Sequence, residues 1–258
     1  MSEPLVCCIG TTEPWNVAGL GLDVRALAAC GARAVSVVAG VSAQDGRGSG
    51  AASAVTPELI AAQFLALERA PIAAIRIGAL LDAPSVAAVA AALAVRLQAS
   101  GAVPVVYDPV LASSAGWVFA LDATVAALLR ELVPLTTVLT PNLAEAARLV
   151  GRSEGDATPE IMARWGHALV AAGAASALVT GGHLADPVDV LVDAAGEVRY
   201  AQPRLPGELR GTGCLLACAL AAALGRGESL RVAVETARAF VRARFASARE
   251  IGGMRAAY

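Results

Sequence analysis

The chain has 258 residues, a length that one α/β domain routinely fills, and 57% of them are hydrophobic. All 20 basic residues are arginine, which excludes mechanisms that need a lysine, such as a Walker A phosphate loop or a lysine Schiff base. The net charge of −2 is spread along the sequence. We therefore expect no basic surface for nucleic acid and none for an anionic membrane.

The five cysteines and the apolar segments predict a cytoplasmic protein. The cysteines are odd in number and lack a CxxC spacing, which fits a reducing compartment better than a disulfide framework. The N-terminus lacks the basic start of a secretory signal. Polar residues and glycine interrupt each apolar run before it reaches a membrane-spanning length.

Short β-branched runs alternate with longer helical stretches, and this alternation predicts βαβ units in a mainly parallel sheet. We expect strands at residues 5–10, 34–39, 73–77, 103–107, 138–139 and 177–180, and a hairpin at 188–192 and 197–200. We expect helices ending near 30, at 57–69, 82–100 and 161–172, around 145, and from about 212 and 229. Glycine and serine at 46–50 predict a loop. No linker or repeat interrupts this order, so a single domain over 1–258 is expected.

The segment Gly211-Thr212-Gly213-Cys214 opens an apolar helix and is the strongest local signal. Its glycines allow a sharp turn, and the unpaired N–H groups of a helix start form an anion site suited to phosphate. The same field is expected to lower the pKa of Cys214. A thiolate there could take a proton from a substrate hydroxyl, or only shape the pocket. The competing interpretation is a glycine turn with a small buried cysteine. Cys218, one turn later, is expected in the core.

Two further segments offer oxygen ligands at strand ends. Asn142 and Glu145 are three residues apart, so in a first helical turn they share one face and could hold Mg²⁺. The same pair equally predicts an ordinary capping box. Asp108 ends a buried strand at the sheet edge where ligands bind, although a single aspartate there is often only a turn former.

Three other segments complete the survey. Thr180-Gly181-Gly182-His183 runs from a strand into a glycine turn that could lie along a nucleotide, although a tight turn is the simpler interpretation of the segment taken alone. Gly19-Leu20-Gly21 lacks the third glycine of a dinucleotide-binding fingerprint, so we exclude that function. The arginines near the C-terminus are expected to form a solvated helix face.

Taken in order, these motifs resemble those of the hydroxymethylpyrimidine/phosphomethylpyrimidine kinases, a branch of the ribokinase superfamily. The resemblance extends over nearly the whole chain and includes Ala18-Gly19 with Asp23, Ser42-Ala43-Gln44-Asp45 and Ile77-Gly78. Cysteine after Gly-Thr-Gly is the distinguishing feature, because most sugar-kinase relatives have aspartate there. The resemblance implies a ribokinase-like three-layer α/β/α sandwich with a mainly parallel central sheet, and a homodimer.

The resemblance also implies a reaction and a site. The reaction is transfer of the γ-phosphoryl group of ATP, with Mg²⁺, to hydroxymethylpyrimidine or its monophosphate in thiamine biosynthesis. Cys214 would be the catalytic residue, with Gly211, Thr212 and Gly213 as its anion hole. The remaining assignments are substrate contacts at Asp23, Gln44, Gly78 and Trp15, nucleotide contacts at Thr180, Gly182, His183 and Arg210, and Mg²⁺ ligands at Asp108, Asn142 and Glu145.

The sequence departs from the family pattern at several of these positions. Trp15 and Val17 replace small residues, so Trp15 either stacks on a substrate ring or partly blocks the pocket. Thr180 replaces a common lysine and Arg210 a common histidine, and Arg210 could supply the lost positive charge. Two alternatives therefore stay open. One is a pyridoxal kinase with the same Gly-Thr-Gly-Cys motif, and the other is a catalytically inactive pyrimidine-binding relative.

Overall fold

A computed structural model describes residues 3–44, 49–101, 103–113, 116–155, 157–182 and 184–256. The main strands in these ranges are β1 Leu5–Thr12, β2 Arg33–Gln44, β3 Ser49–Ala54, β4 Ile72–Ile77, β5 Val105–Tyr107, β6 Val138–Leu139, β7 Ala177–Val179, β8 Val188–Asp193 and β9 Gly196–Ala201. They form one sheet in the order β3-β2-β1-β4-β5-β6-β7-β8-β9. The strands from β2 to β7 in this order are parallel, and antiparallel β3 and β8–β9 flank them.

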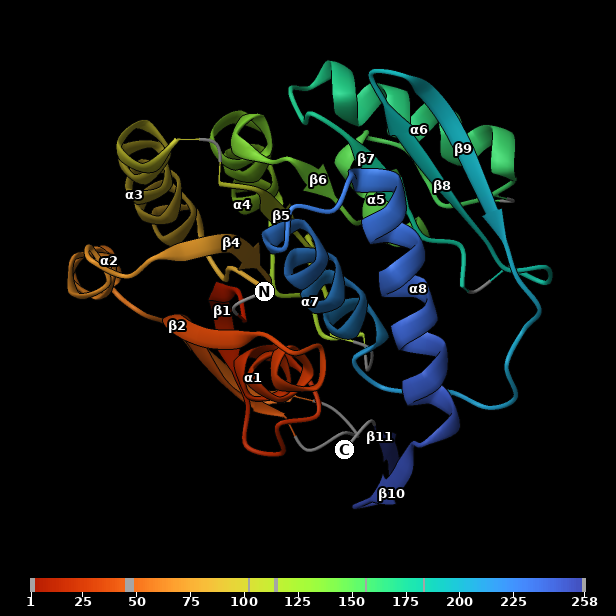
Figure 1. Ribbon diagram of the computed structural model, residues 1–258, viewed down its shortest axis with the longest axis horizontal. Helices are drawn as coiled ribbons and strands as arrows, with labels where there is room; N and C mark the ends of the chain where they lie inside the picture. The colour runs from red at the N-terminus through yellow and green to blue at the C-terminus, as the bar shows by residue number, and fades with distance from the viewer. Residues whose placement is uncertain are drawn as a thin grey trace.

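Helices cover both faces of the sheet. They are α1 Gly19–Ala29, α2 Pro57–Ala66, α3 Ala83–Ser100, α4 Asp122–Ala127, α5 Leu143–Leu149, α6 Pro159–Ala171, α7 Thr212–Gly225 and α8 Leu230–Ala246. One apolar core lies under α1, α7 and α8, and two others lie under α2 to α6 on the opposite face (Figure 1). This arrangement confirms the predicted three-layer sandwich. Among the described residues, no helix is long and apolar enough to cross a membrane.

Local side chains fix where several of these helices begin. Thr56 accepts a hydrogen bond from the N–H of Leu59 at the start of α2, and Pro57 occupies the first turn, as predicted. Asp82 accepts one from Ser85 at the start of α3, at 2.8 Å. No side chain caps α7, which begins at Gly211 in a left-handed conformation with φ of 76°. The first N–H groups of α7, like those of α1, α4 and α8, therefore lack a side-chain partner at the start of the helix.

The order of the strands locates the ligand-binding edge. β1 lies between β2 and β4, so the chain winds in one direction from β1 to β2 and in the other from β1 to β4 and beyond. In open parallel sheets, ligands bind at the carboxyl ends of the strands near such a reversal. β1 ends at Thr12, β4 at Ile77 and β5 at Tyr107. The predicted site residues follow these ends.

The structure corrects several predicted elements. Strand β3 begins at Ser49, inside the segment predicted as a loop, because its backbone pairs with β2. A helical region that the sequence did not indicate runs through α4, a π turn Leu128–Leu132 and a 3-10 turn Val133–Leu135. The chain ends in an unpredicted hairpin, β10 Arg249–Ile251 and β11 Met254–Ala256. Antiparallel pairing with the preceding strand β2 creates β3, and local apolar periodicity cannot report such pairing.

Candidate active site

The glycine turn before α7 lies against the end of β5. A Cβ atom added to Gly213 would lie 3.5 Å from the Oδ1 atom of Asp108, so the turn and this carboxylate are neighbours. Gly213 is exposed, whereas Cys214 and Asp108 are buried. The N–H groups at the start of α7 therefore open next to a carboxylate and a thiol, and their role as an anion site stays a prediction.

Cys214 is enclosed by polar groups from two other segments. The Asp108 carboxylate and the backbone of Gly19 are both close enough to the thiol to influence its charge. Burial raises the pKa of the Cys214 thiol to about 12, and the nearby Arg76 charge only partly opposes this. The expected lowering of this pKa by the helix field was wrong. Desolvation of a thiolate at a fully buried position outweighs the partial charge of a helix N-terminus.

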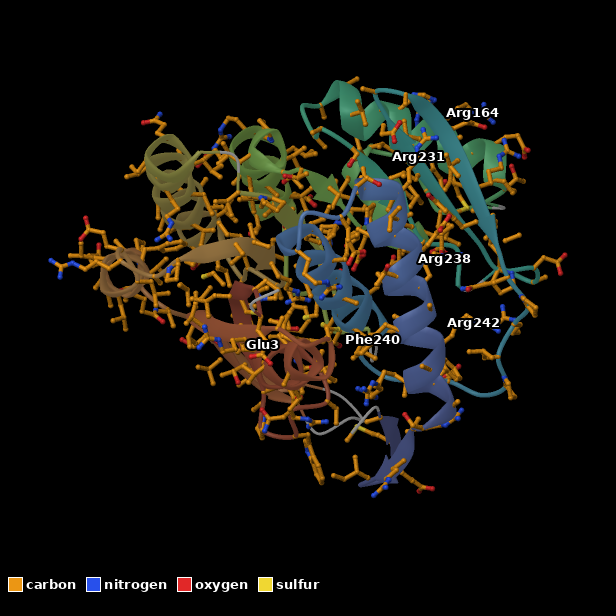
Figure 2. The ribbon with its side chains drawn as sticks, viewed as in Figure 1. Glu3, Arg164, Arg231, Arg238, Phe240 and Arg242 are labelled. Carbon is orange, nitrogen blue, oxygen red and sulfur yellow. The ribbon has the colours of Figure 1, made fainter. Side chains whose placement is uncertain are left out.

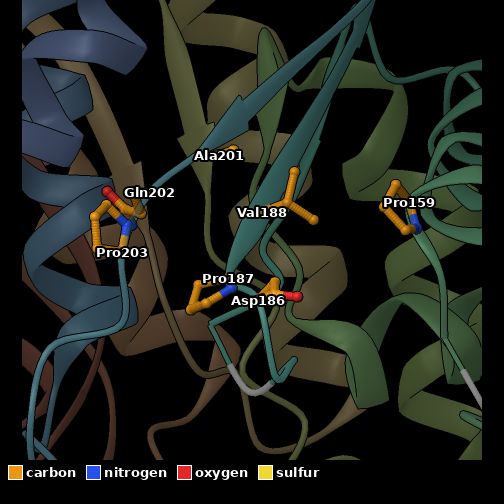
Figure 3. A pocket seen from close by; sticks show the side chains of 7 residues that line it. All are labelled: Pro159, Asp186, Pro187, Val188, Ala201, Gln202 and Pro203. Carbon is orange, nitrogen blue, oxygen red and sulfur yellow. The ribbon is translucent and has the colours of Figure 1, made fainter.

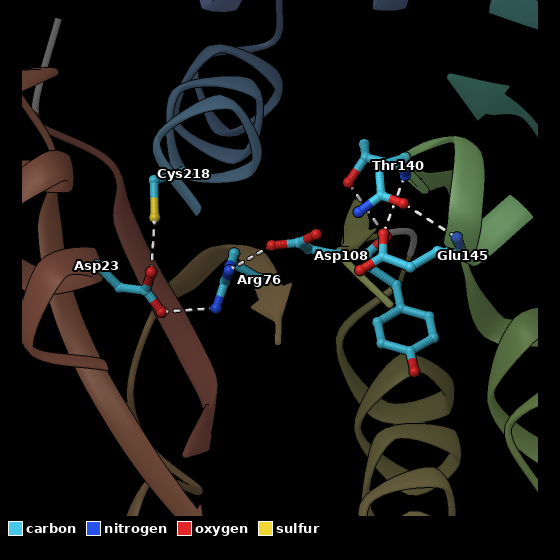
Figure 4. A network of polar contacts seen from close by, with 8 residues as sticks. Asp23, Arg76, Asp108, Thr140, Glu145 and Cys218 are labelled. Carbon is cyan, nitrogen blue, oxygen red and sulfur yellow. Dashed lines mark hydrogen bonds and ion pairs between the residues drawn. The ribbon is translucent and has the colours of Figure 1, made fainter. Parts of the chain in front are cut away.

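Arg76 lies between two carboxylates in the interior of the protein (Figure 4). Its Nη1 atom donates to Asp23 at 2.7 Å, and its Nη2 atom donates to Asp108 at 2.8 Å. Cys218 extends the network, because its sulfur donates to the other oxygen of Asp23 at 3.3 Å. Cys218 is in the core, as predicted, and it also takes part in this network. A chain of hydrogen bonds therefore links α1, β4, the end of β5 and α7.

The charges in this network respond to burial in opposite ways. Burial raises the pKa of Asp23 to about 6, and the Arg76 guanidinium opposes this shift. Burial also raises the pKa of Asp108, again against the effect of Arg76. Burial alone would lower the pKa of Arg76, but the surrounding acidic groups raise it well above its usual value. Arg76 is therefore charged, and it stabilises the ionised form of both carboxylates at neutral pH.

Gly78 makes room for this guanidinium. A Cβ atom at Gly78 would overlap the Nη1 atom of Arg76 and would lie 3.1 Å from its Cζ atom. Gly78 is itself buried. The resemblance assigned Gly78 and Asp23 to substrate contacts, and those roles stay predictions. The contacts present in the structure are with Arg76.

Asn142 and Glu145 form a capping box at the start of α5. The Asn142 side chain accepts from the Glu145 N–H at 3.0 Å, and the Glu145 carboxylate accepts from the Asn142 N–H at 2.9 Å. The capping interpretation of this pair is thus confirmed. Burial raises the pKa of Glu145 to about 8, and the charge of Asp108 adds to the shift.

The same carboxylates are compatible with a cation site. Among the described residues, no cluster of three or more His, Cys, Asp or Glu side chains is arranged as a metal site. Mg²⁺ is usually bound by one or two carboxylates together with phosphate oxygens and water, so such a cluster is not required. Asp108 and Glu145 interact through their charges, and a bound cation would relieve that repulsion. The residues present therefore fit Mg²⁺ bound mainly by phosphate oxygens.

The loop after β1 is organised by a carboxylate that the sequence analysis did not single out. Glu13 accepts hydrogen bonds from the backbone N–H groups of Trp15, Val17 and Ala18, at 2.6, 2.5 and 3.0 Å. Trp15 is 38% exposed. Its ring lies against the C-terminal hairpin, where a Cβ atom on Gly252 would be 2.9 Å from it. Trp15 therefore contacts the hairpin, and its predicted role, stacking on a substrate ring or partly blocking the pocket, stays a prediction.

Gln44 and Arg210, which were predicted to contact substrate and nucleotide, each make a hydrogen bond within the protein. Gln44 ends β2, and its amide donates to the hydroxyl of Ser42 at 2.9 Å. Arg210 immediately precedes the glycine turn, and its backbone N–H donates to the carbonyl of Arg255 in the C-terminal hairpin at 3.0 Å. The C-terminal hairpin therefore contacts both the glycine turn before α7 and the loop that carries Trp15.

The second glycine turn lies beyond β6, on the other side of Asn142. Thr180 pairs with Asn142 in an isolated bridge, and its N–H donates to the carbonyl of Pro141 at 2.9 Å. Gly182 is exposed, and His183 lies outside the described residues. This turn is therefore adjacent to the capping box and shares an edge of the sheet with the first turn.

An open hollow of about 550 Å³ lies near the same end of the sheet (Figure 3). Its lining is mostly apolar, with one carboxylate and one amide, and consists of Pro159, Asp186, Pro187, Val188, Ala201, Gln202 and Pro203. It lies at the start of β8 and the end of β9, the strands that follow the second turn.

The prediction of a solvated face for the C-terminal arginines holds for Arg231, which is 44% exposed, and fails for Arg238. On α8, Arg238 pairs with Asp189 of β8, and both side chains are mostly buried. The sequence analysis also missed Arg76, although one signal was present, since a charged residue interrupts the apolar strand Ile72–Ile77. A buried arginine in such a strand needs carboxylate partners, and Asp23 and Asp108 were available.

Comparisons with known proteins agree with the fold and the motifs. The chain matches the phosphomethylpyrimidine kinase family over residues 14–257. It is 34% identical to a hydroxymethylpyrimidine/phosphomethylpyrimidine kinase of Streptomyces coelicolor over 98% of this chain and 93% of that protein. It is 33% identical to a thiamine biosynthesis bifunctional protein of Geobacter sulfurreducens, over 96% of this chain and 50% of that protein. The pyridoxal kinase of Staphylococcus aureus in complex with pyridoxal has the same fold, with a TM-score of 0.88, 21% identity and coverage of 100% and 94% of the two chains.

Proposed function

Because this chain belongs to the phosphomethylpyrimidine kinase family, we propose that it phosphorylates hydroxymethylpyrimidine or its monophosphate with ATP and Mg²⁺ in thiamine biosynthesis. The observation that carries the proposal is the junction of the uncapped α7 N-terminus, Cys214 and Asp108 at the carboxyl edge of the sheet. An anion-binding turn beside buried acid–base groups is the arrangement that phosphoryl transfer requires. The similarity to a pyridoxal kinase supports the fold alone, because the identity is only 21%.

In the proposed reaction the hydroxyl oxygen of the pyrimidine, or a phosphate oxygen of its monophosphate, forms a bond to the γ-phosphorus, the bond to the bridging oxygen breaks, and ADP leaves. The N–H groups of Thr212 and Gly213 would hold the transferred group, since no side chain caps them. Bound Mg²⁺ would neutralise charge on the phosphates. Positioning and charge stabilisation would supply most of the acceleration.

Cys214 would act as a protonated thiol. With a pKa of about 12 it carries its proton at neutral pH, and it lies beside Asp108. The thiol would pass its proton to Asp108 as it receives the proton of the substrate hydroxyl, so no free thiolate is needed. Arg76 would hold Asp108 in place for this transfer and oppose the rise of its pKa caused by burial.

The test is coupled ATP turnover with Mg²⁺ on hydroxymethylpyrimidine, its monophosphate and pyridoxal. Cys214→Ala should lower kcat by about 100-fold or more, and Cys214→Ser should retain part of it because a hydroxyl can pass on a proton. Cys7→Ala is the matched control, because Cys7 is also a buried thiol with a pKa of about 12 but lies in the core of the opposite face. Turnover only with pyridoxal, or pyrimidine binding with no turnover, would contradict the proposal and support one of the two alternatives.

We also propose that residues 1–258 act as one domain, in the cytoplasm and as a homodimer. The support is the family, whose match spans residues 14–257, together with the resemblance described above. Light scattering of the purified chain would measure the oligomeric state, and a monomer at micromolar concentration would contradict the dimer.

A further inference from the structure

Two ion pairs join α8 to β8, at opposite ends of the strand. Arg238 Nε donates to Asp189 Oδ2 at 2.8 Å, and the two side chains are 11% and 10% exposed. Arg231 pairs with Asp193 at 3.1 Å, and the Arg231 side chain is 44% exposed. Figure 2 shows both arginines on the side of α8 that faces β8 and β9. Asp189 lies near the start of β8, whereas Asp193 ends the strand at the hairpin. The two pairs therefore differ in burial and in what lies beside them.

Asp189 also holds the second glycine turn. Its Oδ1 atom accepts a hydrogen bond from the N–H of Gly181 at 3.1 Å, and this contact is buried. A Cβ atom at Gly181 would overlap the carbonyl oxygen of Val188, so the turn is packed directly against the start of β8. One carboxylate thus bridges Arg238 and the turn. Because Arg238 fixes the orientation of that carboxylate, it fixes the turn indirectly.

The other arm of Arg238 supports the segment after β9. Its Nη2 atom donates to the carbonyl of Tyr200 at 2.6 Å, and the guanidinium lies 5.2 Å from the centre of the Tyr200 ring. One turn later on α8, Arg242 donates to the carbonyl of Pro203 at 3.0 Å. These two carbonyls bracket residues 201–203, which form one wall of the hollow. Arg238 therefore contacts Asp189, which holds the glycine turn, and Tyr200, which precedes the wall of the hollow.

We propose that Arg238 is a positioning residue for the nucleotide, holding the Gly181–Gly182 turn through Asp189 and the wall of the hollow through Tyr200. The inference rests on the proposed function, because it takes this end of the sheet as the nucleotide side of a kinase. Arg238 acts through other groups, since its Nε atom donates to Asp189 and its Nη2 atom donates to the Tyr200 carbonyl. Substitution of Arg238 should weaken nucleotide binding and leave pyrimidine binding unchanged.

The experiment compares Arg238→Met with Arg231→Met in the full chain. Each variant removes one ion pair between α8 and β8, but only the Arg238–Asp189 pair contacts the Gly181–Gly182 turn. Arg238→Met should raise the KM for ATP about tenfold, equivalent to about 1.4 kcal/mol, with the KM for the pyrimidine changed less than about twofold. Arg231→Met should change neither constant. Arg238→Lys should recover part of the loss, because an ammonium can pair with Asp189 but lacks the second arm of the guanidinium.

Hydrogen exchange at the Gly181 amide supplies a readout that does not depend on activity. Exchange should be faster in Arg238→Met than in the wild type and in Arg231→Met, because the carboxylate that accepts this N–H has lost its anchor. An unchanged KM for ATP, or equal increases in both KM values, would overturn the inference. A wild-type chain that neither binds nor uses ATP would refute the proposed function itself, whereas altered Gly181 exchange would still report the contact.

Discussion

Two arginines organise opposite sides of the same sheet edge, and they do so from different layers of the fold. Arg76 comes from a central strand, is fully buried and pairs with two carboxylates. Arg238 comes from a covering helix, is slightly exposed and pairs with one. Removing one partner of a buried ion pair leaves the other charge unpaired, and the resulting loss of folding stability increases with the burial of that charge. We infer that Arg76 supports both the fold and the site, whereas Arg238 mainly supports one turn.

The largest expected effect is on stability and comes from Arg76. Arg76→Met should lower the free energy of unfolding by about 3–5 kcal/mol, because it leaves Asp23 and Asp108 buried without their cation. Arg238→Met should cost only about 1–2 kcal/mol, since its partner reaches the edge of the solvent. Urea unfolding at neutral pH measures both values. Equal losses in the free energy of unfolding for the two variants would contradict the proposed difference between Arg76 and Arg238.

A second test concerns Glu145, the acidic residue between the Arg76 network and the second glycine turn. Glu145 has a pKa of about 8 in the folded chain, raised by burial and by Asp108 from an ordinary value of 4.5. The folded state thus holds a proton that the unfolded state releases, so this group destabilises the fold as pH rises from about 4.5 to 8. Relative to Glu145→Gln, the wild type should lose about 1 kcal/mol per pH unit between pH 5 and 8, measured by urea unfolding without divalent ions. Glutamine keeps the capping box. Parallel pH profiles for the two chains would contradict the prediction.

The glycine turn before α7 gives a smaller effect. Gly211 has a φ of 76°, and a Cβ atom there would lie 2.6 Å from the carbonyl oxygen of Val17. Gly211→Ala should therefore cost about 1–3 kcal/mol of stability and displace the α7 N-terminus. Gly213→Ala is the matched control, because its Cβ atom would meet Asp108 at an ordinary 3.5 Å. A Gly211→Ala variant as stable as Gly213→Ala would show that the turn tolerates a side chain.

The smallest expected effect is a lack of reaction at Cys214. Because its pKa is about 12, the fraction of thiolate at pH 8 should be negligible, and iodoacetamide should leave it unmodified in the folded chain. Cys214 should react only after denaturation, which mass spectrometry of the digested protein would reveal. Rapid modification of the native chain would instead favour the thiolate originally expected from the helix field.

Much of the fold was predictable because it depends on neighbours in the sequence. The order of parallel strands, the Thr56 cap and the start of α7 at Thr212 all follow from local patterns. Strand β3 and the hairpin of β10 and β11 escaped prediction, since each depends on backbone pairing that local propensity does not report. The capping box at Asn142 was one of two interpretations of the same spacing, and the hydrogen bonds selected it.

The candidate site divides in the same way. The sequence by itself determined the glycine turn, its cysteine and the strand-end aspartate, because each is encoded within a few residues of the chain. Only the tertiary structure decided that Arg76 joins Asp23 and Asp108, which are 53 and 32 residues away, and that Arg238 reaches Asp189, 49 residues away. It also reversed the expected pKa shift of Cys214. Charge pairing and desolvation depend on what surrounds a group in space, and residues distant in the sequence supply those surroundings.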